Sequence, residues 1–166
     1  NQIIHTSRCF GLYKVYGQTW KRREDVPMFY RDYDDVSAQL LADLDADYSK
    51  IREEIIKRNP QTDYKYMLDY LALERFSYKS HNTDVKESFV TSKTLVAIGT
   101  PVIQNAEGLW EVDRNHRFFL DDIYYGNCIA KWLAEKMDIE TPTIDAILHW
   151  AQIVRNEKFI DENNKL

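Results

Sequence analysis

Arg117-Phe-Phe-Leu-Asp-Asp-Ile-Tyr-Tyr-Gly126 leads directly into a segment whose apolar residues recur with the period of a helix. A guanidinium and two adjacent carboxylates stand on either side of a short apolar spacer. Opposite charges beside apolar side chains are costly for a purely structural element, because a charge loses hydration when it is buried. The same arrangement suits a site that grips a carboxylate and orients a base. This stretch therefore bears on both fold and function.

Apolar residues recur at three- and four-residue steps in several other segments, which is typical of amphipathic helices. We expect helices at about residues 34–59, 64–78, 121–137 and 142–154. Asp34 and Asp35 open the first helix, and acidic residues in a first turn suit the helix dipole. Pro142 falls at or near the first turn of the last helix. The sequence predicts a mainly α fold, with residues 1–166 forming a single all-helical domain.

The remaining segments are less regular. Residues 1–30 lack a clean period and are expected to be extended or irregular, with at most a short helical turn. The 80–112 region is expected to be loop with one or two helical turns, followed by an extended approach over 113–120. In the 64–78 helix, Phe76 is among the residues expected to face inward. The polar tail over 157–166 is expected to fray.

Composition excludes several classes of function. With 44% hydrophobic and 30% charged residues, the 166-residue chain is typical of one folded domain. A net charge of -5 argues against a nucleic-acid partner. No apolar run approaches membrane-spanning length, so no membrane partner is expected. Cys9 and Cys128 are isolated thiols, which indicates a reducing compartment and predicts a cytoplasmic location.

Nucleotide-binding loops and metal motifs are missing from the sequence. The five glycines never reach the spacing of G-x-G-x-x-G or of a phosphate-binding loop. No His-Glu-x-x-His, Cys-x-x-Cys or carboxylate–histidine metal spacing appears either. We therefore predict no metal site and assign no cofactor-binding residue within this chain.

The charged residues of the 117–126 stretch each have two interpretations. One aspartate is enough to cap a helix, so we expect one of Asp121 and Asp122 to cap and the other to be available to hold an imidazole. Arg117 forms either an ion pair with an aspartate or a bidentate grip on a substrate carboxylate. From the residues alone, both interpretations of Arg117 stay open.

Four histidines are the remaining candidates for acid–base chemistry. His149 lies on an amphipathic helix and is interpreted as structural, and His81 lies in a polar turn and is expected to be exposed. His116 is either a surface residue or the edge of a site. His5, between an apolar pair and small polar residues, is by itself a weak candidate.

Four motifs, in order along nearly the whole chain, resemble the C-terminal helical domain of the opine dehydrogenases, the octopine/nopaline dehydrogenase family. The first is Asn1-Gln-Ile-Ile-His5, similar to Asn-x-x-x-His, and the second is Phe29-Tyr30, followed by Val36 to Leu44-Asp45 in a long helix. The third is Arg117 to Gly126, similar to Arg-[Tyr/Phe]-x-x-Glu-Asp-[Ile/Val]-Pro-[Tyr/Phe]-Gly. The fourth is Ile139-Glu-Thr-Pro142-Thr-Ile-Asp145, similar to Thr-Pro-x-[Ile/Met]-Asp. The chain departs from the family pattern at Thr6 (usually proline), Asp121 (glutamate) and Tyr124 (proline). None of these departures removes a reacting group.

The resemblance implies a fold like the C-terminal domain of 6-phosphogluconate dehydrogenase and an enzyme of two domains. An N-terminal Rossmann domain, absent from this chain, would bind NAD(P)H, and the helical domain would close over the substrates. The implied reaction is the reductive condensation of an α-keto acid with the amino group of an amino acid, and its reverse. By motif position, His5 is the catalytic acid/base, Asp122 orients it and stabilises its protonated form, and Arg117 binds a substrate carboxylate. Without the Rossmann domain, the isolated chain is expected to be inactive.

Two alternatives come from other classes. The helical domains of ketopantoate reductase and glycerol-3-phosphate dehydrogenase follow the same plan, but they rely on a lysine, and no lysine here occupies a comparable motif. A non-enzymatic helical interaction module explains the amphipathic helices but not the joint placement of His5, Arg117 and Asp122. In an enzyme these three should converge on one open concave face, and in an interaction module they should scatter. The aromatic-rich helical faces also make a homodimer an expectation.

Overall fold

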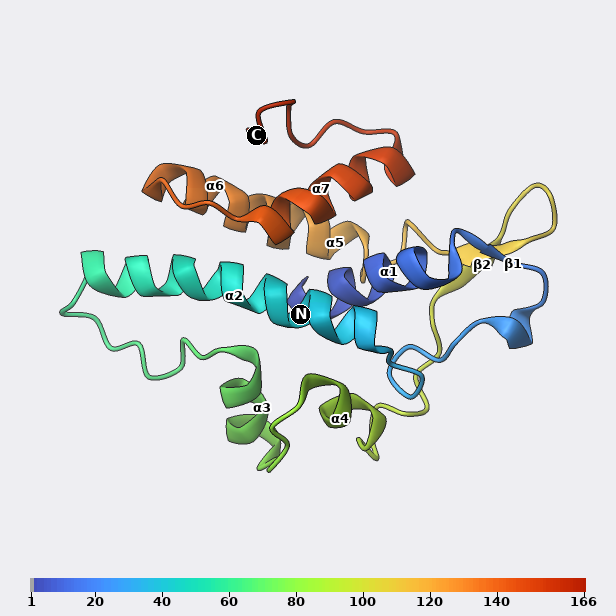
Figure 1. Ribbon diagram of the computed structural model, residues 1–166, viewed down its shortest axis with the longest axis horizontal. Helices are drawn as coiled ribbons and strands as arrows, with labels where there is room; N and C mark the ends of the chain where they lie inside the picture. The colour runs from blue at the N-terminus through green and yellow to red at the C-terminus, as the bar shows by residue number, and fades with distance from the viewer. Residues whose placement is uncertain (1) are drawn as a thin grey trace.

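The computed structural model describes residues 2–166, so Asn1, the first residue of the Asn-x-x-x-His motif, lies outside the described residues. The described chain is mainly helical, as predicted, with a small sheet at one end (Figure 1). The helical elements are α1 (Gln2–Tyr16), η1 (Arg23–Asp25), α2 (Asp35–Arg58), α3 (Tyr70–Tyr78), α4 (Val85–Val90), α5 (Leu120–Asp122), the π-helical turn η2 (Ile123–Asn127), α6 (Cys128–Met137) and α7 (Pro142–Arg155). The strands are β1 (Thr19–Trp20), β2 (Val102–Gln104) and β3 (Trp110–Val112).

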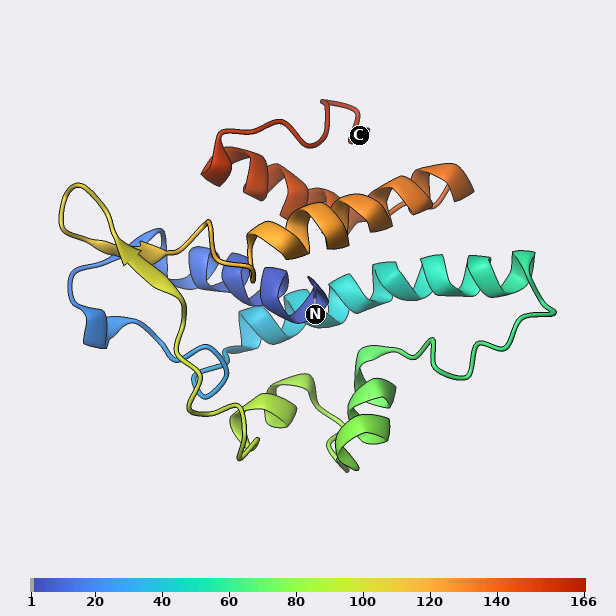
Figure 2. The same ribbon diagram turned by 180° about the vertical axis from the view of Figure 1, so that it is seen from behind.

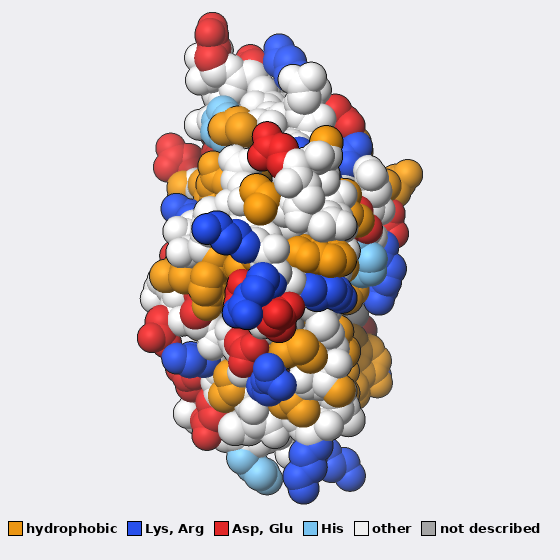
Figure 3. All heavy atoms as spheres, turned by 90° about the vertical axis from the view of Figure 1, so that its right-hand side faces the viewer, with side chains coloured by type: hydrophobic (Ala, Val, Ile, Leu, Met, Phe, Trp, Pro, Cys, Tyr) orange, Lys and Arg blue, Asp and Glu red, His pale blue; other side chains and the backbone are white. Residues whose placement is uncertain are grey.

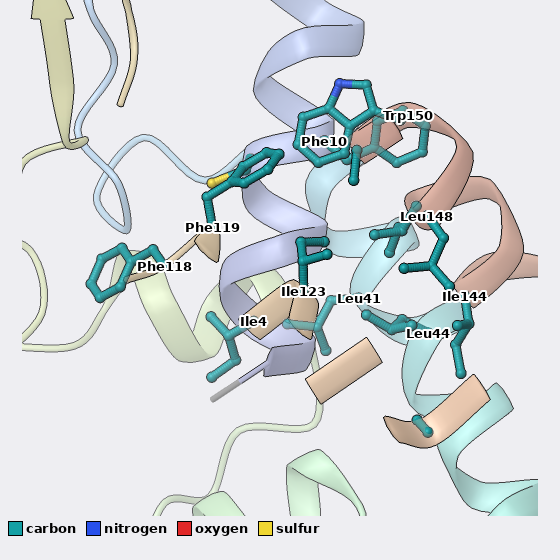
Figure 4. Close-up of a cluster of buried hydrophobic side chains, with 14 of the residues drawn as sticks. Ile4, Phe10, Leu41, Leu44, Phe118, Phe119, Ile123, Ile144, Leu148 and Trp150 are labelled. Carbon is teal, nitrogen blue, oxygen red and sulfur yellow. The ribbon is translucent and has the colours of Figure 1, made fainter. Parts of the chain in front are cut away.

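The long helix α2 lies between two groups of helices. Helices α6 and α7 lie along one side of it, and α3 and α4 lie on the other (Figures 1 and 2). Side chains from α1, α2, the 118–123 segment and α7 meet in one core (Figure 4). The side chains labelled there are Ile4, Phe10, Leu41, Leu44, Phe118, Phe119, Ile123, Ile144, Leu148 and Trp150. Residues near the start of the chain and the 118–123 segment are therefore packed together through this core.

The expectation of irregular structure over residues 1–30 was wrong for α1, a helix of 15 residues. Every residue from Ile4 to Leu12 is buried, on all sides of the helix. A helix surrounded by its neighbours has no polar face, so its sequence lacks the amphipathic period. Gly11 allows α1 to approach α2 closely, because a Cβ atom there would lie 2.9 Å from the Cα atom of Ser37.

A fully buried arginine joins α1 to the segment before α2. The side chain of Arg8 is 0% exposed. Its Nε donates to the Phe29 carbonyl (2.9 Å), its Nη1 to Asp34 Oδ2 (2.5 Å) and Ser37 Oγ (3.0 Å), and its Nη2 to the carbonyls of Met28 (3.2 Å) and Asp32 (2.8 Å). The other oxygen of Asp34 accepts from the Ser37 backbone N–H at 2.7 Å and caps α2. Arg8 thus holds the turn over residues 28–34 and the start of α2 in place.

The predictions for α2 and α7 are confirmed, and the structure adds a cap that the sequence could not show. Helix α7 begins at Pro142, as the first-turn proline indicated. The backbone N–H groups of Thr143 and Ile144 donate to Asp47 Oδ2 at 2.7 and 3.2 Å. Asp47 lies on α2 and is 2% exposed. The N-terminus of α7 is therefore capped by another helix, since a carboxylate there satisfies N–H groups that have no intrahelical partner.

The region after α2 differs from the expectation in three ways. Helix α3 begins at Tyr70, because the Asp69 side chain accepts from the Ala72 N–H at 2.7 Å and caps the helix there. Phe76, expected to face inward, is 63% exposed. Helix α4 confirms a helical turn within 80–112, but β2 and β3 were not predicted. They pair antiparallel and join β1 in a sheet of order β1-β3-β2, with strands too short for a visible two-residue period.

Two further expectations about connecting segments were wrong. Residues 113–120 form turns rather than an extended approach, with the Phe119 N–H bonded to the His116 carbonyl at 2.9 Å. The tail does not fray fully: the N–H groups of Phe159 and Ile160 donate to Gln152 Oε1 at 2.7 and 2.6 Å, and Ile160 is 2% exposed. One apolar side chain in a polar tail is enough to anchor it to α7.

On the face shown in Figure 3, acidic and basic side chains intermingle. Apolar side chains are scattered between them rather than gathered over one element. This mixture accords with the net charge of -5 and presents no broad basic surface on that side.

Replacing Arg8 with methionine should lower the free energy of unfolding by about 3–5 kcal/mol, because the Asp34 carboxylate and three backbone carbonyls would lose their partner. Urea denaturation followed by circular dichroism measures the change. Arg31→Met is the matched control, since Arg31 is exposed and pairs only with its neighbour Asp32. Equal stabilities of the two variants would contradict the central role of Arg8.

Candidate active site

A histidine on α1 contacts side chains from two distant segments. His5 Nδ1 lies 2.6 Å from Asp122 Oδ2, at the end of α5. His5 Nε2 lies 3.2 Å from the hydroxyl of Tyr30, in the turn held by Arg8. An ionised carboxylate only accepts hydrogen bonds, so Nδ1 carries the hydrogen and donates to Asp122. In the neutral imidazole, Nε2 is then an acceptor, and the Tyr30 hydroxyl donates to it.

The aromatic–glycine step of the 117–126 stretch allows this contact. Residues 123–127 form a π-helical turn, a rare local structure that is frequent at functional sites. A Cβ atom on Gly126 would lie 2.8 Å from Gln2 Cγ, so glycine lets the turn approach the start of α1. The buried Asn127 Nδ2 donates to Thr6 Oγ1 (3.1 Å) and to the Asp122 carbonyl (3.2 Å). Asp122 is thereby placed against α1.

The ring of Phe118 lies between Arg117 and His5 and contacts both. The Phe118 ring stacks on the His5 ring, with centroids 3.8 Å apart and planes 17° from parallel. The guanidinium carbon of Arg117 lies 4.9 Å from the centroid of the same Phe118 ring. Arg117 is exposed and forms no ion pair within residues 2–166. Its alternative interpretation, as one half of a structural ion pair with an aspartate, therefore has no support in the described structure.

Burial and the neighbouring Asp122 carboxylate shift the pKa of His5 in opposite directions. Burial lowers the pKa of His5 below its usual 6.5, while the hydrogen bond and negative charge of Asp122 raise it and the positive charge of Arg117 lowers it. Burial raises the pKa of Tyr30 to about 12, and Arg117 opposes that rise. Asp122 therefore favours the charged imidazole, as expected, but burial outweighs it. The net effect is a neutral imidazole at neutral pH.

The three predicted residues lie together, but not on one open face. His5 is only 6% exposed and the Asp122 side chain is 14% exposed, whereas Arg117 is exposed. Asp121 does not cap the helix: α5 begins at Leu120 without a side-chain cap, because backbone carbonyls of the preceding turn accept its first N–H groups. The arrangement is a buried acid–base pair beside an exposed cation.

Three residues around His5 were not identified from the sequence: Tyr30, Phe118 and Asn127. Tyr30 belongs to the Phe29-Tyr30 motif, so the sequence pointed to this residue, but only the folded chain places its hydroxyl at His5 Nε2.

Among the other histidines, the His116 ring meets the Phe118 ring edge-on at 4.5 Å and so lies at the edge of the site. His149 Nε2, on α7, lies 2.6 Å from Asn164 Oδ1 in the C-terminal tail, in accordance with a structural role.

Neither a metal cluster nor a membrane-spanning helix occurs in the part of the chain that the structure describes. Residues 2–166 contain no group of three or more His, Cys, Asp or Glu side chains placed to hold a metal ion. No helix in that range is both long enough and apolar enough to cross a membrane.

The fold resembles part of solved structures of a dehydrogenase. Solved structures of octopine dehydrogenase with NADH and L-arginine, and with NADH and agmatine, both match 97% of this chain with a TM-score of 0.82. The sequence identity is 20%, and the match covers 40% of those chains. At that identity the likeness shows the fold alone.

Sequence comparison gives the family. The family model described as NAD/NADP octopine/nopaline dehydrogenase, alpha-helical domain, matches residues 1–155, and the chain belongs to this family. Tauropine dehydrogenase from Arabella iricolor is 23% identical over 163 residues, which is 96% of this chain and 41% of that relative. Opine dehydrogenase from Haliotis discus hannai is 22% identical over 153 residues, which is 90% of this chain and 37% of that relative. The chain thus spans about two fifths of the length of these relatives.

These findings confirm the resemblance and the mainly α fold class that the motifs indicated. They favour the opine dehydrogenase assignment over the ketopantoate reductase or glycerol-3-phosphate dehydrogenase alternative and over the interaction module.

The pKa of His5 should respond specifically to Asp122. In an NMR titration of the histidine ring protons, the midpoint for His5 should lie below 6.5, and Asp122→Asn should lower it further by removing two contributions that raise it. Asp121→Asn is the matched control, since the Asp121 carboxylate is exposed and adjacent in sequence. An unchanged or raised midpoint in Asp122→Asn would refute this account of the pair.

Proposed function

We propose that this chain is the substrate-binding and catalytic helical domain of an opine dehydrogenase. The reaction is the NAD(P)H-dependent reductive condensation of an α-keto acid with the amino group of an amino acid, and the reverse oxidation. The observation that carries the proposal is the 2.6 Å contact between His5 Nδ1 and Asp122 Oδ2 in a chain of this family. Such a pair fixes the tautomer and orientation of the imidazole and leaves Nε2 for proton transfer.

His5 is proposed to move the protons of the condensation. When the amine nitrogen bonds to the keto carbon, Nε2 takes a proton from that nitrogen and gives it to the former keto oxygen, which becomes a hydroxyl group. The second nitrogen proton follows the same route as the C–O bond breaks, so the oxygen leaves as water and an imine forms with no net change in protons on His5. A group that performs both steps must have a pKa near the working pH, and imidazole is the side chain suited to this.

Arg117 is proposed to bind a substrate carboxylate. Its planar guanidinium offers paired donors that match a carboxylate, and the Phe118 ring supports it next to His5. Fixing the carboxylate restricts the position of the neighbouring α-carbon, which accelerates the reaction through orientation.

NAD(P)H is proposed to be bound mainly by an N-terminal Rossmann domain outside this chain. The residues described here do not fit the nucleotide well, because the five glycines are too dispersed to form a phosphate-binding turn. The cofactor would supply the hydride that reduces the imine carbon. The solved octopine dehydrogenase structures contain NADH, which supports the choice of cofactor class.

We also propose a cytoplasmic location and a homodimer. Cys9 and Cys128 are unpaired, and burial raises the pKa of Cys9 to about 12, so its thiol is unreactive. The half-exposed apolar side chains Ile129 and Trp132 on α6 support self-association. Sedimentation velocity on the complete protein would contradict the dimer if only monomer is found.

In a protein that joins this chain to its Rossmann domain, His5→Ala and Asp122→Asn should each lower kcat by about 10²–10⁴-fold, because acid–base catalysis is lost. NAD(P)H binding, measured by fluorescence titration, should be retained. Asp121→Asn and His81→Ala are controls at exposed positions and should keep wild-type rates. Near-wild-type turnover by either site variant, or NAD(P)H oxidation by the isolated chain with any keto acid and amine, would refute the proposal.

A further inference from the structure

Both ring nitrogens of His5 already have a hydrogen-bond partner within the chain. Nδ1 lies 2.6 Å from Asp122 Oδ2, and Nε2 lies 3.2 Å from the Tyr30 hydroxyl. The Phe118 ring stacks on the His5 ring with centroids 3.8 Å apart, and the Phe29 ring meets it edge-on at 5.9 Å. The imidazole is thus enclosed, and His5 is only 6% exposed. A substrate atom therefore exchanges a proton with Nε2 either by displacing the Tyr30 hydroxyl or through that hydroxyl.

The Tyr30 side chain is held firmly in its place. It is 5% exposed, and its ring packs against the rings of Phe29 and Phe89, with centroid distances of 5.0 and 5.3 Å. The buried guanidinium of Arg8 donates to the carbonyl of Phe29, the residue before Tyr30, at 2.9 Å. Moving the hydroxyl away from the imidazole would disturb this packing. Proton transfer through the hydroxyl requires no such movement.

Tyr30 also lines a cavity whose walls do not include His5. The cavity has a volume of about 440 Å³ and lies between α3, α4 and the start of α1, and of the described residues Ile4 and Tyr30 line it, whereas His5 does not. Cavities of this volume suit small ligands or part of one. A tyrosine hydroxyl can donate one hydrogen bond while it accepts another. Tyr30 can therefore accept a proton from a group on the cavity side while it donates to His5 Nε2.

We propose that the Tyr30 hydroxyl relays protons between the reacting substrate atoms and His5 Nε2. The proposal rests on the proposed function and deepens it, because it adds a residue to the proton route of the condensation. The amine nitrogen that has bonded to the keto carbon gives a proton to the Tyr30 oxygen as the Tyr30 hydrogen passes to Nε2. In the return step, Nε2 gives its proton to the Tyr30 oxygen as the hydroxyl gives its hydrogen to the former keto oxygen. The second nitrogen proton follows the same route, and Tyr30 is a neutral hydroxyl before and after each transfer.

The raised pKa of Tyr30 accords with a relay rather than with an independent base. Burial raises the pKa of Tyr30 to about 12, while the positive charge of Arg117 opposes the rise. Near neutral pH the tyrosinate is therefore scarce, and Tyr30 alone does not remove a proton from the amine. A relay avoids the charged form, because one proton arrives as another leaves.

Tyr30→Phe removes the hydroxyl and keeps the packed ring. The test uses the protein that joins this chain to its Rossmann domain, with pyruvate and each of L-arginine, L-alanine and taurine. With any pair that wild type turns over, Tyr30→Phe should lower kcat by about 10²-fold and change KM by less than about twofold, because the transfer step alone is impaired. Tyr33→Phe is the matched control and should keep the wild-type kcat. Tyr33 lies in the same turn, is 2% exposed, and has its hydroxyl 3.5 Å from Ser7 Oγ.

Nitrogen NMR of His5 in the isotope-labelled, substrate-free chain tests the hydrogen bond without turnover. At a pH above the His5 midpoint, Tyr30→Phe should move the Nε2 resonance toward that of a free lone pair, whereas Tyr33→Phe should not. An unchanged Nε2 resonance in Tyr30→Phe overturns the relay. Wild-type kcat in Tyr30→Phe, or an equal loss in both variants, also overturns it and leaves the proposed function standing. If wild type turns over none of the pairs, the proposed function fails, and the relay fails with it.

Discussion

The buried guanidinium of Arg8 is the constraint on which the arrangement of this domain depends. It is 0% exposed and donates to acceptors in the turn before α2 and at the start of that helix. A buried charge is tolerated only when its donors are satisfied, so every one of these acceptors is held at hydrogen-bond distance. Because Tyr30 lies within that turn, the same network fixes the hydroxyl that faces His5 Nε2.

The site is assembled by close backbone approach rather than by one local motif. Gly11 brings α1 against α2, and Gly126 brings the π-helical turn against the first turn of α1. Arg8 holds the turn over residues 28–34, which contains Tyr30. His5 therefore has little freedom to move away from Asp122. Orienting a catalytic group before substrate binds reduces the entropy lost during the reaction. The packing of three sequence-distant segments thus fixes the orientation of the His5 imidazole.

How much the sequence could predict depends on how each element is buried. Helices α2 and α7 have one apolar face and one polar face, so their period was visible. Helix α1 has no polar face over most of its length, and the strands of two or three residues are too short for any period. His5 and Asp122 were paired through a family motif, since nothing local links residues 117 positions apart. The contact between Tyr30 and His5 could not be predicted, because only the fold brings the two side chains within hydrogen-bond distance.

The opposing influences on the pKa of His5 are compatible with the acid–base role proposed for it. Burial alone would keep the His5 ring neutral but leave its tautomer undefined. In a fully hydrated histidine–aspartate pair, the carboxylate would favour the protonated ring, whose second nitrogen has no free lone pair to accept a proton. With burial stronger than Asp122, the ring is neutral while the hydrogen is fixed on Nδ1. The lone pair of Nε2 then points to the Tyr30 hydroxyl, which also lines the cavity next to α3 and α4. One tyrosine thus joins the His5–Asp122 pair to the cavity.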